Sequence, residues 1–204
     1  MTTTLVPAIV PLSLLEALRN VDAPVEDGLE ELAGEVVSKR LGLSATVQAQ
    51  IARYAWHADR RHAVALDEAS SVFRLVGRRP DAPLVFADAG RRAARRASVR
   101  WPPLLGVLPA GVGRAVGARA AGRVARQLVG GRLIVEDAEA RGEVPAPLGL
   151  DVVPDGTGCG FYGAFFGELL RGMAGFEGAV RHERCRARGD ADCEWRARAV
   201  GGYR

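Results

Sequence analysis

Residues 159–173, with the sequence Cys-Gly-Phe-Tyr-Gly-Ala-Phe-Phe-Gly-Glu-Leu-Leu-Arg-Gly-Met, decide the fold that we expect for this chain. The large apolar residues of this segment recur at intervals of three and four, the spacing of one helix face. They are Phe161, Phe165, Phe166, Leu169, Leu170 and Met173. The segment is therefore predicted to be a helix that begins at Cys159. Unpaired N–H groups at a helix start lower the pKa of a thiol and favour the thiolate, the form that binds metal ions.

Two short strands are predicted after this helix. Residues 178–185 and 193–200 lack the helical spacing, and the run between them, Arg-Ala-Arg-Gly-Asp-Ala-Asp, favours a turn. A hairpin of this kind brings Cys185 and Cys193 together at its mouth. A cysteine at the start of the preceding helix can join them.

His182 is the candidate for a fourth ligand. Three thiolates and one imidazole fill the tetrahedron around Zn(II) and leave no position for water, which is the pattern of a structural zinc site. Residues three apart in a regular strand point to opposite faces, so His182 and Cys185 converge only if Cys185 lies in the turn or beside a β-bulge. Buried free cysteines without a metal are the alternative interpretation.

The composition is that of an ordinary globular protein. Of the 204 residues 48% are hydrophobic and 25% are charged, which argues against wholesale disorder and suits one domain with an N-terminal extension. Three clustered cysteines do not make a disulfide framework, which favours a reducing cytoplasm. Pro7 and Pro11 interrupt the uncharged N-terminus, which argues against a signal peptide, and no apolar run suits a membrane span. The net charge of +4 comes without a nucleic-acid-binding motif, so no nucleic-acid partner is expected.

Residues 1–80 are predicted to form a helical N-terminal extension. Apolar spacing and helix start and stop signals place helices over residues 11–19, 27–41, 45–61 and 68–76. Ser44 is expected to cap the third helix, and Asp67 the fourth. A Pro-containing linker at residues 78–83 then separates this extension from a second unit, residues 81–204.

The second unit is predicted to be an α+β domain. Helices are expected over residues 84–97 and 111–130, and strands over Arg132–Glu136 and residues 148–154. With the two strands of the hairpin, the total is four. We therefore expect a four-stranded antiparallel sheet packed with helices, with the Cys159 helix across it.

One signature lies in the last quarter of the chain. It consists of Cys159, His182, Cys185, the Gly189-Asp190 turn and the run Cys193-Glu194-Trp195. This signature resembles the closing signature of the 4-vinyl-reductase (4VR) domain, the small-ligand-binding branch of the fold shared with TRAPP vesicle-tethering subunits. In the phenol-sensing bacterial regulators of that family, three zinc-bound cysteines have the same separations, and a glutamate stands where this chain has His182. The resemblance thus implies a zinc site completed by His182 or by the adjacent Glu183.

The resemblance extends loosely back to about Leu84 and implies a function. The 4VR relatives bind phenols or other small apolar molecules between the helix layer and the sheet, which implies a sensor or carrier of a small hydrophobic molecule, and a homodimer. A stand-alone 4VR protein is most similar to the accessory protein of bacteriochlorophyll synthesis, so a tetrapyrrole is one specific ligand. The aromatic residues of the region suit a ligand pocket or a plain core equally; they are Trp101, Phe161, Tyr162, Phe165, Phe166 and Trp195.

Two other functions stay open. Reduction of a vinyl group follows from the family name alone, because no cofactor motif that would supply a hydride is visible. The glycines of residues 111–117 do not have the Gly-x-Gly-x-x-Gly spacing of a dinucleotide loop. A TRAPP-type interaction protein would instead use its N-terminal helices or its surface to dimerise.

Overall fold

The computed structural model describes residues 4–23, 41–99, 110–136 and 138–199. Two predicted segments, the helix over residues 27–41 and the apolar loop that contains Trp101, therefore lie wholly or almost wholly outside the described residues. The helices are α1 (Ile9–Asp22), α3 (Ala45–Asp59), α4 (Leu66–Gly77), α5 (Ala82–Ser98), α6 (Ala110–Val129) and α7 (Cys159–Ala174), with short 3-10 turns η1 (Leu41–Leu43) and η3 (Arg186–Arg188). None of the helices in the described ranges is both long and apolar enough to cross a membrane.

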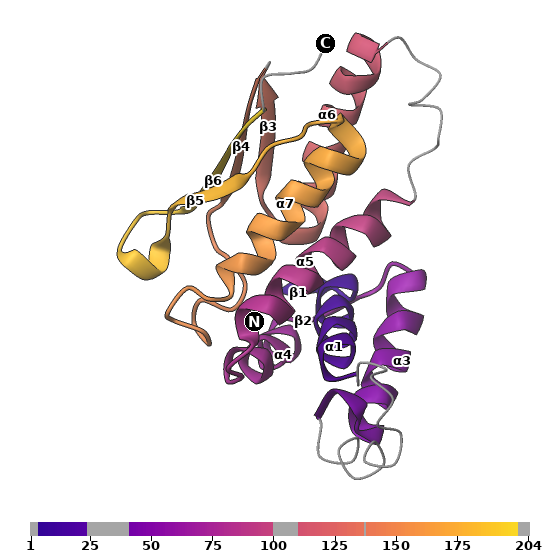
Figure 1. The fold of residues 1–204 in the computed structure, drawn as a ribbon. Helices are drawn as coiled ribbons and strands as arrows, with labels where there is room; N and C mark the ends of the chain where they lie inside the picture. Colours follow the sequence, from indigo (N-terminus) through magenta and orange to yellow (C-terminus); the bar gives the residue numbers. More distant parts are fainter. Residues whose placement is uncertain (1–3, 24–40, 100–109, 137, 200–204) are drawn as a thin grey trace, which may run out of the picture.

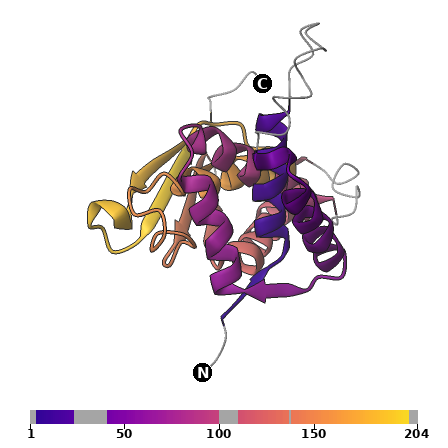
Figure 2. The same ribbon diagram turned by 90° about the horizontal axis from the view of Figure 1, so that it is seen from below.

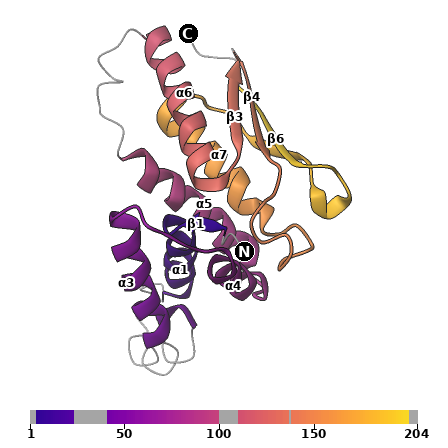
Figure 3. The ribbon, with the colours of Figure 1, turned by 180° about the vertical axis from the view of Figure 1, so that it is seen from behind.

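The predicted antiparallel sheet is confirmed. Its order is β3-β4-β6-β5, and every neighbouring pair is antiparallel. The strands are β3 (Arg132–Glu136), β4 (Glu139–Val144), β5 (Val180–Arg184) and β6 (Cys193–Arg198). The helices all lie on one side of this sheet (Figures 1 and 3). The chain therefore has the α+β architecture that the change of spacing along the sequence predicts.

One predicted strand is in the wrong place. The second strand of the sheet is β4 and not residues 148–154, which form successive turns. Gly149 has a φ of 95°, and the N–H of Val153 bonds to the carbonyl of Gly149, so the chain curls here instead of extending. The sequence of β4 is Glu-Ala-Arg-Gly-Glu-Val, which is poor in β-branched and aromatic residues. Its pattern of residues therefore does not indicate a strand.

The helical character of the N-terminal extension is confirmed for its described residues. Ser44 caps α3, because its side chain accepts a hydrogen bond from the N–H of Val47 at 3.3 Å. Asp67 is not the cap of α4: the helix begins at Leu66 after Ala65, and Asp67 lies in its first turn. Strands β1 (Leu5–Pro7) and β2 (Ala63–Ala65) pair with each other, which joins the start of α1 to the start of α4.

The N-terminal helices share a core with the rest of the molecule. Helix α1 packs against both α3 and α5, and α5 packs in turn along α7. Helices α1 and α3 lie farthest from the sheet (Figure 2). Buried apolar side chains form one continuous cluster from the first strand to the last.

Helix α7 is the central element of this core because it is apolar on two faces. Towards the sheet, the rings of Tyr162 and Phe166 lie 5.7 and 5.5 Å from that of Trp195. Towards the other helices, the ring of Phe161 lies 5.8 Å from that of Phe73 on α4. A helix with aromatic side chains on both faces is stable only between two layers, which is where α7 lies.

Glycines allow the neighbouring helices to approach α7 closely. A Cβ at Gly90 of α5 would lie 2.1 Å from the backbone oxygen of Phe161, and one at Gly117 of α6 would lie 1.8 Å from that of Met173. Both positions therefore require a residue without a side chain.

We expect Gly90→Ala to destabilise the protein, by about 2 kcal/mol or more, because the added methyl group must push two packed helices apart. Gly172→Ala is the matched control, since no atom lies within 4 Å of a Cβ at Gly172. That change should raise stability by about 0.5–1 kcal/mol, the usual gain in a helix interior. Urea unfolding followed by circular dichroism measures both changes, and equal stabilities for the two variants would contradict the close crossing.

Candidate metal centre

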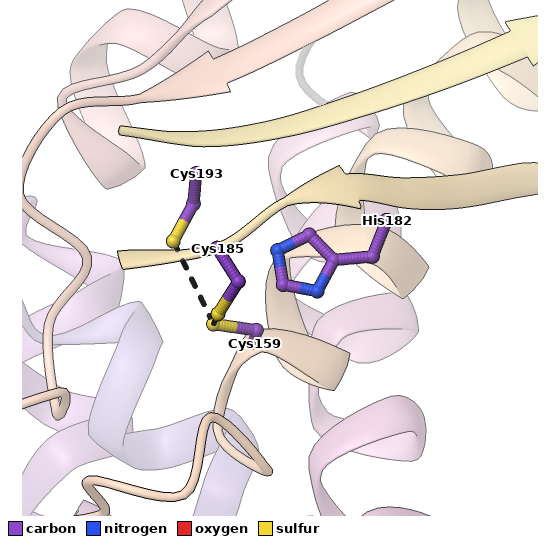
Figure 4. Close-up of side chains that lie close together, drawn as sticks. All are labelled: Cys159, His182, Cys185 and Cys193. Atoms are coloured by element: carbon purple, nitrogen blue, oxygen red, sulfur yellow. Dashed lines mark hydrogen bonds between the residues drawn. The ribbon is translucent and has the colours of Figure 1, made fainter. Parts of the chain in front are cut away.

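Four side chains from three elements converge at the lower end of the sheet (Figure 4). Cys159 is the first residue of α7, and Cys193 is the first residue of β6. His182 lies within β5, and Cys185 directly follows that strand. All three cysteines are free and buried. The structure thus brings together the four residues that the sequence predicts as ligands.

The distances between these side chains suit one metal ion. Their ligand atoms all lie within 4.8 Å of one another, and the Sγ of Cys159 is 3.9 Å from the Sγ of both Cys185 and Cys193. A tetrahedral ion with metal–sulfur distances of about 2.3 Å would place its sulfurs about 3.8 Å apart. The site can therefore hold a metal ion with little rearrangement.

His182 reaches the cysteines through a β-bulge. His182 pairs with Trp195, but Arg184 pairs with Glu194, so β5 contains one extra residue, Glu183, between them. The bulge changes which face the following residues point to, and His182 and Cys185 share one face as a result. Glu183 is exposed and is not among the converging groups, so the geometry favours His182 over Glu183 as the fourth ligand.

The imidazole of His182 is ready to act as a ligand. Its ring stacks on the indole of Trp195, with centroids 4.7 Å apart and planes 8° from parallel. Its Nε2 is buried and has no hydrogen-bond partner among the described residues. Burial, followed by the nearby charge of Arg188, lowers the pKa of His182, which favours the neutral form that binds metals. A buried nitrogen without a partner is costly, and a metal ion would satisfy it.

The turn between β5 and β6 fixes the two hairpin cysteines. The N–H of Cys185 donates to the carboxylate of Asp190 at 2.6 Å, and the N–H of Asp190 returns a bond to the carbonyl of Cys185 at 3.2 Å. Gly189 has a φ of 93°, which this tight loop requires. The backbone N–H of Arg186 points at the Sγ of Cys193 from 3.3 Å and would stabilise a thiolate there.

Burial favours the protonated form of two of the thiols, those of Cys159 and Cys193. Burial, and then the proximity of Cys193 and Cys185, raises the pKa of Cys159 far above its ordinary value. Burial also raises the pKa of Cys193. At Cys159 desolvation therefore raises the pKa more than the helix start lowers it, contrary to the expectation from the sequence. Metal binding by these thiols must then release protons.

A charge cluster lies on the opposite face of the sheet, directly behind the site. The carboxylate of Glu194 is 1% exposed and accepts hydrogen bonds from Arg141, Arg184 and Arg196 at 2.9, 2.5 and 2.5 Å. Burial raises the pKa of Glu194, but these arginines prevail and hold it below its ordinary value. Glu194 thus joins β4, β5 and β6 next to Cys193.

A cleft of about 700 Å³ adjoins the candidate metal centre. The turn after Cys185 supplies Arg186 and Ala187 to its wall, and α7 supplies Phe161 and Tyr162. The other walls come from β1, the starts of α1 and α4, the end of α6 and residues 146–154. A cleft of this size is in the range of small-molecule sites.

The predicted pocket residues divide between the cleft and the core. Phe161 and Tyr162 line the cleft. Phe165, Phe166 and Trp195 are at most 2% exposed and contact other aromatic rings within the core. Trp101 lies outside the described residues.

Sequence reasoning did not identify the rest of the cleft wall. Residues 148–154 were predicted as a strand, and the last turn of α6 was predicted only as part of the helix over residues 111–130. The one available signal was the density of proline and glycine in residues 145–156, which indicates an irregular loop.

Comparison of the sequence with protein-family models found no match, and comparison with curated proteins found none either. The signature around the three cysteines therefore stays a resemblance to the 4VR domain. The geometry of the metal centre and of the adjoining cleft is the main guide to function.

We expect the protein to bind one Co²⁺ per chain with the intense visible absorption of a tetrahedral thiolate complex. Cys193→Ser should abolish this spectrum. His182→Asn should weaken cobalt binding by about tenfold or more, because even supporting residues of metal ligands contribute this much. His62→Asn is the control, since His62 is exposed and lies outside the converging group. If His182→Asn and His62→Asn bound cobalt equally well, His182 would not be a ligand.

Proposed function

We propose that the protein is a zinc-containing module of the 4VR type that binds a small hydrophobic molecule, as a sensor or a carrier. The observation that carries this proposal is the direct connection of the metal centre to the cleft. The same turn holds Cys185 at the centre and presents Arg186 and Ala187 to the cleft.

Zinc is the metal that this ligand set favours. Three thiolates and an imidazole are soft or borderline donors, and four protein ligands close the tetrahedron. Such a site has no open position for substrate or water, so its role is structural. The reducing cytoplasm, which keeps such thiols free, is the compartment that we propose for it.

The zinc ion would cross-link the β5–β6 hairpin to the start of α7. The elements so joined are far apart in the sequence, with Cys159 and Cys193 separated by 34 positions. Because the site does not exist in the unfolded chain, the free energy of zinc binding stabilises the folded hairpin. It thereby fixes the part of the cleft wall that follows Cys185.

The cleft suits an apolar ligand. Most of its wall is aliphatic or aromatic, and its buried part includes Val6, Val10, Phe161 and Tyr162. The hydroxyl of Tyr162 already donates to the carbonyl of Leu148 at 3.1 Å, so it presents little unsatisfied polarity. The resemblance of the sequence signature to 4VR domains, which bind small apolar molecules, supports the same function.

Protein purified without chelators should contain one zinc per chain by elemental analysis. Removal of zinc with a strong chelator should lower the midpoint of thermal unfolding, because the ion binds only the folded chain, and re-addition of zinc should restore it. An unchanged midpoint after complete removal of the metal would contradict a structural role.

The neutral fluorophore N-phenylnaphthylamine should bind the zinc-loaded protein with an increase in fluorescence, because transfer to an apolar site enhances its emission. Ser70 lines the cleft, whereas Ser71 is exposed and does not. Ser70→Trp should fill the cleft and reduce binding, and Ser71→Trp should leave it unchanged. Absence of binding, or equal loss in the two variants, would argue against a ligand site in this cleft.

A further inference from the structure

The cleft beside the metal centre has an apolar interior and a charged mouth. Its fully buried lining residues are apolar or, like Tyr162, already hydrogen-bonded. Among the described residues that line it, the charged ones are all exposed, and they are Arg126, Asp151 and Arg186. Polarity therefore increases from the inner wall to the solvent.

The two arginines at the mouth are free to bind a ligand. Arg126 lies in the last turn of α6 and forms no ion pair with any residue in the described ranges. Arg186 likewise forms none there, and one of its Nη atoms donates to the carbonyl of Pro145 at 2.9 Å. That bond holds the guanidinium in place and leaves further N–H groups available.

Several other arginines in the described ranges are paired. Arg79, Arg95 and Arg96 each pair with a carboxylate at 2.6–2.8 Å. Helix α6 contains no acidic residue, so Arg126 has no partner on its own helix. The two guanidinium groups without ion pairs therefore give the cleft an excess of positive charge. Asp151 offsets one of these charges, so the described lining residues carry a formal net charge of about plus one.

We propose that the natural ligand is amphipathic and anionic: an apolar body that fills the cleft and a carboxylate that lies at the mouth against Arg126 and Arg186. This inference rests on the proposed ligand-binding function and specifies the chemical class of the ligand. Guanidinium groups bind carboxylates through paired, charge-assisted hydrogen bonds. An acid group placed inside the cleft would lose its hydration without a partner, so the mouth is the one position where both halves of the ligand are satisfied.

Decanoate and decanamide test this proposal because they have the same size and differ in charge. Each competes with N-phenylnaphthylamine for the zinc-loaded protein at neutral pH. We expect decanoate to bind about tenfold more tightly than decanamide, and high salt to reduce the difference. Arg126→Gln and Arg186→Gln should each weaken decanoate binding by a larger factor than decanamide binding. Asp151→Asn should strengthen decanoate binding, because Asp151 is the one acidic group among the described residues of the cleft wall.

Arg123→Gln is the matched control, since Arg123 is exposed on the same helix and does not line the cleft. It should change neither affinity. If decanoate and decanamide displaced the fluorophore equally, or if Arg123→Gln matched Arg126→Gln, the anionic class would be overturned and the apolar cleft would stand. If the fluorophore itself did not bind, the proposed function would fail and this inference with it.

Discussion

The convergence of three sulfur atoms at the start of α7 is the constraint on which the C-terminal half of the structure depends. Cys159 belongs to the helix layer, whereas Cys185 and Cys193 belong to the sheet. A metal ion held by these sulfurs would fix where α7 begins relative to β6, in the same position that the aromatic contacts of Tyr162 and Phe166 with Trp195 hold. The close crossings at Gly90 and Gly117 hold the remaining helices against the same element.

The burial of the site affects two of its candidate ligands. It raises the pKa of Cys159 and leaves the Nε2 of His182 without a partner, both of which are unfavourable in the metal-free chain. A bound cation reverses both effects, because it stabilises the thiolates and accepts the lone pair of the imidazole. Three merely buried cysteines would need neither the bulge nor the unpartnered histidine, and both features fit a group of side chains that could hold a cation.

Sequence patterns predicted the parts of the structure that depend on strong local signals. The three-and-four spacing after Cys159 located α7, and Ser44 located the start of α3. Strand geometry required that Cys185 lie in the turn or beside a bulge, and the structure has both, because Cys185 follows β5 and a bulge lies between His182 and Arg184. Strand β4 was missed because its stability comes from its position between β3 and β6 and from Gly142, which the ring of Phe166 covers; none of this is a local property of its sequence.

The cleft could not be predicted because side chains in neighbouring turns of α7 have different surroundings: some line the cleft and others lie in the core. Phe161 and Tyr162 reach it from the first turn of α7, while Phe165 and Phe166, one turn further along, are enclosed by the sheet and by α5. The spacing of apolar residues is the same in both turns, so periodicity cannot separate ligand wall from core. What distinguishes the first turn is a tertiary contact: the hydroxyl of Tyr162 donates to the carbonyl of Leu148, which belongs to the loop that forms much of the cleft wall. All four aromatic side chains are buried, so the loop and the turn packed around the first turn of α7, and not a pattern within the helix, decide which of them border the cleft.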